Sequence, residues 1–209
     1  MLVLTGNFMI EEDDKHVLGL ELPTDPRWVN IAEMSLEEIL VDHAFCEQKA
    51  ATSCISLIVQ FSEKQELVDI LSPIVKEEWA HFEQVLSEMK KRGFSLGKPR
   101  KDEYVNRLNG IVKKGGSRAQ QLVEKLLINA LIEARSCERF RQLWKFISDQ
   151  SLSRFYYKLM VSEAGHYKTF LEMAKNYLPE EQVMTRWKEI LRQEAEIVKT
   201  LEVRADRMH

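Results

Sequence analysis

The sequence is poor in the residues that make tight turns, with 8 glycines and 5 prolines among 209 residues. A sandwich or barrel of many short strands needs more of both at its turns, so this composition argues against an all-β fold. The longest run without a charged residue covers residues 50–62. This run is too short to cross a bilayer as a helix, which takes about 20 residues. We therefore expect no membrane partner.

Cysteine is also scarce, and Cys46, Cys54 and Cys137 form no Cys-x-x-Cys pair. An odd number of cysteines without metal-binding spacing fits a reducing compartment, so we expect a cytoplasmic location. The N-terminus begins apolar but has no basic leader and becomes acidic at residues 11–14. We therefore also expect no signal peptide.

The sequence does contain two long stretches without glycine or proline, residues 27–72 and 117–164. Apolar residues recur in both every three or four positions, which is typical of long amphipathic helices. Ser35 and Glu38 match a capping box at the start of the first helix, and Pro73 predicts a kink or a broken first turn in the second. We predict one all-α domain with long helices at about 35–61, 65–91, 119–147 and 151–177, a short helix at about 102–112, and a C-terminal helix at about 179–203. Residues 1–34 would be an N-terminal extension and residues 97–118 a connector.

Two Glu-x-x-His pairs lie on the second and fourth long helices, Glu78-Trp-Ala-His81 and Glu163-Ala-Gly-His166. Residues at positions i and i+3 share one helix face, so each pair can bind one metal ion or one side of a metal pair. The chain holds 25 glutamates, so such pairs also arise by chance and on their own indicate little.

Each pair is preceded by a glutamate in the middle of the preceding long helix: Glu47 lies 31 residues before Glu78, and Glu133 lies 30 residues before Glu163. A repeated unit of one helix with Glu and a second with Glu-x-x-His is the ligand pattern of a di-iron carboxylate bundle. Four carboxylates balance the charge of two ferrous ions. Four buried glutamates without cations would cost several kcal/mol in desolvation and repulsion.

Other polar residues near these positions have ordinary interpretations too. A solvated helix face is the usual place for a single glutamate, and we expect this for Glu77, Glu83 and Glu138. His43 and Asn129 each lie four residues before a candidate ligand. They are either hydrogen-bond partners of the ligands or polar residues with a purely structural place.

At these positions the sequence resembles the tRNA 2-methylthio-N6-isopentenyladenosine hydroxylases, the MiaE family. The resemblance covers most of the chain from about residue 22. Four stretches carry it: DHAFCEQKAA at residues 42–51, EEWAHF at 77–82, IEARSCERF at 132–140 and SEAGHY at 162–167. The third stretch is far more specific than a bare Glu-x-x-His, which many ferritin-like proteins share.

The resemblance implies a ferritin-like four-helix bundle with a non-haem di-iron centre. It also implies O₂-dependent hydroxylation of the isopentenyl group on a modified adenosine beside the anticodon of tRNA. The implied ligands are six side chains, with no catalytic residue beyond them: Glu47 and His81 on one iron, Glu133 and His166 on the other, and Glu78 and Glu163 as bridges.

Such a centre needs electrons from another protein. Carboxylates and imidazoles suit iron and leave open positions for O₂. The chain has neither a glycine-rich dinucleotide motif nor an iron–sulfur cysteine pattern. We therefore expect an external electron donor, a reductase or a ferredoxin-type protein.

The connector of residues 97–118 carries a net charge of +5. Such a patch could track tRNA phosphates, and Tyr104 and Asn106 could stack on or bond to an unpaired base. The alternative is a solvated connector without this role. Arg135 and Arg139 either pair with carboxylates of the bundle or face the substrate entrance. The candidate tRNA-binding residues are Lys98, Arg100, Lys101, Arg107, Lys113, Lys114 and Arg118.

Two other functions stay open at the level of sequence. A ferritin-like protein that handles iron or peroxide would share the ligand set, whereas a metal-free helical tRNA-binding protein would hold no iron. A ferritin shell would be a very large oligomer. A rubrerythrin usually carries a Cys-x-x-Cys module, which this chain lacks. The sequence indicates no oligomeric state.

Overall fold

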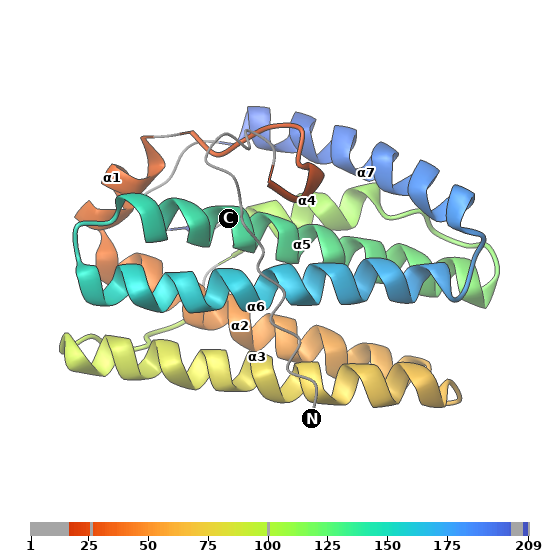
Figure 1. Ribbon diagram of the computed structural model, residues 1–209, viewed down its shortest axis with the longest axis horizontal. Coiled ribbons are helices and arrows are strands. Elements are labelled where there is room, and N and C mark those ends of the chain that lie inside the picture. The colour runs from red at the N-terminus through yellow and green to blue at the C-terminus, as the bar shows by residue number, and fades with distance from the viewer. Residues whose placement is uncertain (1–16, 26, 100, 202–206, 209) are drawn as a thin grey trace, which may run out of the picture.

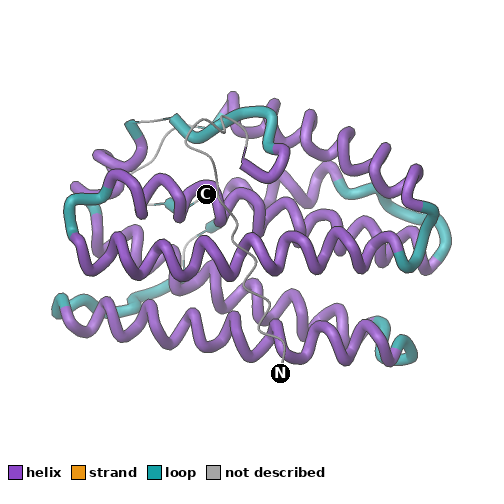
Figure 2. Tube along the Cα trace, in the orientation of Figure 1, coloured by secondary structure: helices purple, strands orange, loops and turns teal. Residues whose placement is uncertain are grey.

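The computed structural model describes residues 17–25, 27–99, 101–201 and 207–208, and within them the fold is all-helical (Figures 1 and 2). This confirms the predicted fold class. The described elements are η1 (Val17–Gly19), α1 (Trp28–Met34), α2 (Leu36–Gln60), α3 (Gln65–Lys91), α4 (Glu103–Ile111), α5 (Arg118–Phe146), α6 (Gln150–Lys175) and α7 (Glu180–Thr200). None of these helices is both long and apolar enough to cross a membrane.

Four long helices form the bundle, in which α2 packs against α3 and α5 packs against α6 (Figure 1). Connections at residues 61–64 and 147–149 join the members of each pair, and such short connections make neighbouring helices antiparallel. Helix α7 lies against α5, and α4 lies against α7. The four predicted long helices agree with the observed ones to within two residues at each end. The predicted end of the last helix, residue 203, lies outside the described residues.

Two details at helix starts differ from the predictions. The Ser35 side chain makes no cap hydrogen bond, because α1, which was not predicted, ends just before it and the Ser35 backbone N–H donates to the carbonyl of Ala32. Helix α3 continues through Pro73 without a broken turn. Proline leaves the carbonyl of Asp69 without its helical donor, but Asp69 is exposed and its carbonyl can bond to water.

Side-chain caps fix the starts of the helices that frame the site. Ser117 and Gln120 form a complete capping box at the start of α5. The Asp149 carboxylate accepts the backbone N–H groups of Ser151 and Leu152 at the start of α6. These caps bond amides that have no partner inside the helix.

The apolar core is divided into two clusters along the bundle. On α2, Phe45 belongs to one cluster and Cys54 to the other; on α6, Met160 and Phe170 are divided in the same way. All helices of the bundle therefore pass from one apolar cluster to the other through a middle layer, and this layer contains the candidate ligands.

Candidate metal centre

The middle layer brings all six candidate ligands together, and every one of them is buried. The ligand atoms of the first group lie within 4.8 Å of one another, and so do those of the second. The two groups share two glutamates, so six side chains make two overlapping sites. The first group is Glu47, Glu78, His81 and Glu163, and the second is Glu78, Glu133, Glu163 and His166.

Each helix contributes its ligands by simple spacing. The Glu78 and Glu163 carboxylates lie one turn before the histidine on the same helix, so both groups face inward. His81 Nδ1 lies 3.4 Å from a Glu163 oxygen and 3.7 Å from a Glu78 oxygen. His166 Nδ1 lies 2.7 Å from Glu78 Oε1 and 3.7 Å from Glu163 Oε2. Both imidazoles therefore present the same nitrogen to the shared carboxylates.

The pKa values in the metal-free cluster show how strongly these groups interact. Burial, with the nearby Glu163 charge, raises the pKa of Glu78 to about 7, and the same two causes raise the pKa of Glu133. Burial alone would lower the imidazole pKa values. Contacts with Glu163 and other carboxylates instead raise the pKa of His81 to about 12 and that of His166 to about 11. Without metal, protons bound to the imidazoles and to some of the carboxylates therefore offset the negative charge of the cluster.

Several buried atoms of the cluster contact other members of the cluster, as in the short His166–Glu78 pair, but have no hydrogen-bond partner outside it among the described residues. They are Glu78 Oε1 and Oε2, His81 Nδ1, Glu163 Oε1 and His166 Nδ1. Buried polar atoms normally have partners. Four carboxylates and two imidazoles are also the donor set expected for a pair of divalent iron ions. The residues therefore fit a two-metal centre.

Two side chains bond to the cluster from outside. His43 Nε2 lies 2.6 Å from Glu47 Oε1, and burial lowers the pKa of His43 to about 3. The neutral imidazole therefore donates its Nε2 proton to the Glu47 carboxylate. Glu77 Oε2 lies 2.8 Å from His166 Nε2, although the Glu77 side chain is 57% exposed.

Asn129 makes hydrogen bonds elsewhere. Its amide oxygen accepts from Ser53 Oγ at 2.8 Å, and its amide nitrogen donates to the carbonyl of Lys125 at 2.8 Å. These bonds join α2 to α5 one turn from the Glu133 carboxylate.

The expectation of a solvated glutamate is confirmed for Glu83, which is exposed, but it is wrong for Glu138. The Glu138 side chain is buried and accepts hydrogen bonds from Thr24 and from Arg135 Nη1. Arg135 also bonds to Glu194 at 2.7 Å, so of the two interpretations of this arginine, pairing with carboxylates is correct.

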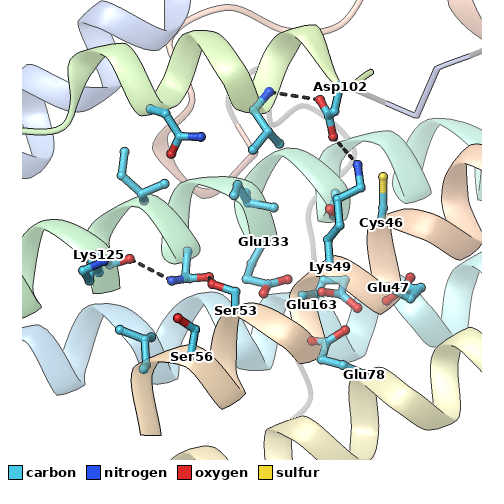
Figure 3. Close-up of a pocket in the computed structure, with 18 of the residues that line it drawn as sticks. Cys46, Glu47, Lys49, Ser53, Ser56, Glu78, Asp102, Lys125, Glu133 and Glu163 are labelled. Carbon is cyan, nitrogen blue, oxygen red and sulfur yellow. Dashed lines mark hydrogen bonds and ion pairs between the residues drawn. The ribbon is translucent and has the colours of Figure 1, made fainter. Parts of the chain in front are cut away.

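A cavity of about 310 Å³ opens onto the carboxylates between α2 and α5 (Figure 3). Glu47, Glu78, Glu133 and Glu163 form its floor, and apolar side chains such as Ile132 and Val105 also line it. Helix α4 covers the cavity. Asp102 caps α4 by accepting the Val105 N–H and also pairs with Lys49 at 2.6 Å, which ties α4 to α2.

Part of the basic connector is engaged in ion pairs, although Lys113 and Arg118 also remain exposed. Arg107, Lys113 and Arg118 form ion pairs with glutamates. Lys98, Lys101 and Lys114 are exposed, and Arg100 lies outside the described residues. Of the possibilities raised for Tyr104, stacking on a base is excluded, because this ring is 2% exposed and its hydroxyl donates to Glu194.

Of four further residues that line the cavity, the sequence predicted one functional candidate and left three unnoticed. Lys49, Lys114 and Lys125 line the cavity, and so does Met208 near the end of the chain. Only Lys114 lies within the predicted basic connector. The other three could be found only by knowing which surfaces of α2, α5 and the chain end face the cavity.

A helical bundle that directs Glu and Glu-x-x-His side chains to one buried centre is a ferritin-like carboxylate bundle. The solved structure of protein 43 from Synechococcus, which has aldehyde deformylating oxygenase activity, has a similar fold. Its TM-score is 0.85 at 32% identity, over 91% of this chain and 94% of that one. The chain belongs to the tRNA-(MS[2]IO[6]A)-hydroxylase (MiaE) family, whose sequence pattern matches residues 11–209.

Two curated relatives have the same description, tRNA 2-(methylsulfanyl)-N(6)-isopentenyladenosine(37) hydroxylase. The protein from Pseudomonas putida is 40% identical over 76% of this chain and 76% of its own length. The protein from Salmonella typhimurium is 27% identical over 78% of this chain and 77% of its own length.

Proposed function

We propose that this chain hydroxylates the isopentenyl group of 2-(methylsulfanyl)-N6-isopentenyladenosine beside the anticodon of tRNA. The reaction would use O₂, two iron ions and an external electron donor, and it would take place in the cytoplasm. The observation that carries the proposal is the position of the six-residue cluster, whose four carboxylates form the floor of a cavity open to the surface. Family membership supplies the substrate class.

The proposed ligands divide as the two overlapping groups do. Glu47 and His81 would hold one iron, Glu133 and His166 the other, and the remaining two glutamates would bridge them. When bound, two adjacent irons supply the electrons and Lewis acidity needed to activate O₂ for attack on an unactivated C–H bond.

The residues around the cluster would hold it in a defined geometry. The Nε2 proton of His43 fixes one oxygen of Glu47, and the carboxylate of Glu77 accepts the Nε2 proton of His166 and so directs Nδ1 of that ring inward. Partners of this kind fix the tautomer and the orientation of a ligand.

The cavity supports a substrate that is apolar at one end and polar at the other. Apolar side chains line the cavity together with the carboxylates, and they would surround an isopentenyl group and exclude water. Lys114 and Lys125 also line the cavity and would meet phosphates of the tRNA. Exposed Lys98 and Lys101 would extend this basic surface.

The test supplies iron-loaded protein with O₂, a chemical reductant and tRNA that bears the prenylated adenosine. The tRNA is then digested to nucleosides and analysed by mass spectrometry. We expect that nucleoside to gain one oxygen atom with the wild type and with Glu83→Gln, and to stay unchanged with Glu163→Ala. Unmodified tRNA from a protein that holds two irons and consumes O₂ would contradict the proposed substrate.

The structural similarity to an aldehyde deformylating oxygenase favours one second candidate, oxidation of an aliphatic aldehyde. The apolar cavity wall is compatible with an alkyl chain, but an aldehyde gives no reason for lysines in the cavity lining. The same preparation is therefore given a fatty aldehyde instead of tRNA. We expect no release of formate, and formate release at a rate above that of tRNA hydroxylation would favour the second candidate.

A further inference from the structure

The cavity has exposed residues at one end and a fully buried residue at the other. Ser56 and Lys114 are exposed at one end, whereas Met208, at the other, is 0% exposed. On α2 the cavity extends from Cys46, near the closed end, to Ser56, a distance of about 15 Å at the rise of an α-helix. The candidate ligand Glu47 follows Cys46 directly, so the closed end lies close to the carboxylate floor.

Residues 207 and 208 form the closed end. The backbone N–H of Met208 donates to Asp42 Oδ2 at 2.8 Å. Arg207 Nη1 lies 3.8 Å from Asp42 Oδ1, and the Arg207 carbonyl accepts the indole N–H of Trp28 at 3.3 Å. The last described residues are thus attached to both α1 and α2.

Asp42 is an unusual residue for this position. It is buried on α2, beside the apolar cluster that contains Met208, and burying a carboxylate is costly unless it gains hydrogen bonds or an ion pair. Its contacts with Arg207 and Met208 supply both. Asp42 therefore holds Arg207 and Met208 in place against the cavity.

We propose that Met208, held by Asp42, is the wall that limits the depth of the substrate cavity and so selects the size of the alkyl substituent that fits. This rests on the proposed function for the identity of the substrate. A thioether side chain adapts its shape to an apolar neighbour, and its complete burial keeps water from the closed end. Met208 is thus a specificity-determining residue, and Asp42 is a positioning residue.

The first test compares two tRNA substrates, one with the five-carbon isopentenyl group and one with a ten-carbon geranyl group on the same nitrogen. We expect Met208→Ala to raise the ratio of kcat/KM for the larger over the smaller group at least tenfold, because even one methylene in an apolar pocket changes selectivity by about tenfold or more. Asp42→Asn should raise the ratio less, since it weakens the anchor and leaves the wall in place.

Two control variants distinguish loss of the residue that limits cavity depth from a general loss of packing. Met208→Leu keeps the volume and should leave the ratio unchanged. Met89→Ala removes a methionine of nearly equal burial from the same apolar cluster, but Met89 does not line the cavity, so its ratio should also stay unchanged. If the wild type hydroxylates tRNA but Met208→Ala leaves the kcat/KM ratio unchanged, Met208 does not limit the cavity. The proposed function would then still hold.

A second measurement is independent of turnover. The metal-free protein is labelled with [¹³C]methyl methionine, and xenon, which binds apolar cavities, is dissolved in the sample. We expect xenon to shift the Met208 methyl resonance more than that of Met89, with Met208→Leu providing the assignment. Equal shifts of the Met208 and Met89 resonances would contradict the proposed role of Met208, even if the protein hydroxylates tRNA. A larger Met208 shift supports that role, even if the protein does not hydroxylate tRNA.

Discussion

Replacing Glu78 with glutamine should remove metal binding and at the same time stabilise the metal-free protein. Glu78 is fully buried and shared by both candidate sites, and its carboxylate lies 2.7 Å from the His166 imidazole. Glutamine keeps the size of this side chain but cannot carry a negative charge.

The size of the effect follows from the pKa of Glu78. Burial and the Glu163 charge raise this pKa from 4.5 to about 7. Each tenfold change in an ionisation constant corresponds to about 1.4 kcal/mol, so the ionised carboxylate costs up to about 3 kcal/mol of folding free energy above pH 7. Because the folded pKa is raised, the cost is absent below the unfolded pKa of 4.5 and grows as pH rises between 4.5 and 7.

Chemical denaturation of metal-free protein at several pH values measures this directly. We expect Glu78→Gln to be more stable than the wild type by about 1–3 kcal/mol at pH 7.5 and by nothing at pH 4. A titration with ferrous iron should show that the variant no longer binds two equivalents. Glu83→Gln, on an exposed face of the same helix, should match the wild type in both assays. A variant less stable than the wild type at pH 7.5, or one that still binds two irons, would refute this reasoning.

Three further predictions concern residues around the site. Glu77→Ala removes the carboxylate that orients one imidazole and should weaken iron binding by about tenfold, measured by competition with a chelator; unchanged affinity would contradict its orienting role. Asp149→Ala removes the cap of α6 and should cost about 1 kcal/mol at pH 7. Its pKa lies below the ordinary value because bonds to an arginine and to backbone amides outweigh burial, so the loss should fade as pH falls below about 4. Glu194→Ala removes a partner of buried Arg135 and should lower the free energy of unfolding by about 3 kcal/mol. Glu196→Ala, at an exposed ion pair, should lower it by at most about 0.5 kcal/mol. Equal losses would mean that burial does not determine the cost.

The helices and their inward faces could be predicted from the sequence because both depend on local spacing. Apolar residues at intervals of three and four specify each helix, and the same geometry puts Glu78 and His81 on one face. The repeat of this pair after Glu47, with an equivalent unit at Glu133, was sufficient to select the six residues that the structure brings together.

The surroundings of the site depend on contacts between residues far apart in the chain. Glu138 was expected on a solvated face, but it accepts a hydrogen bond from Thr24, which lies 114 positions away in the sequence. Asp42 bonds to Met208 across 166 positions. No local pattern records such a pair, because each partner taken alone is compatible with a solvent-exposed helix or chain end.

The sequence by itself therefore determined the class of fold and the chemistry of the centre, since helical periodicity and ligand type are properties of short segments. Only the tertiary structure decided what encloses the centre. Helix α4 became the cover of the cavity and Met208 its closed end because the packing of α4, α7 and residues 207 and 208 on the bundle selects which of their side chains face inward.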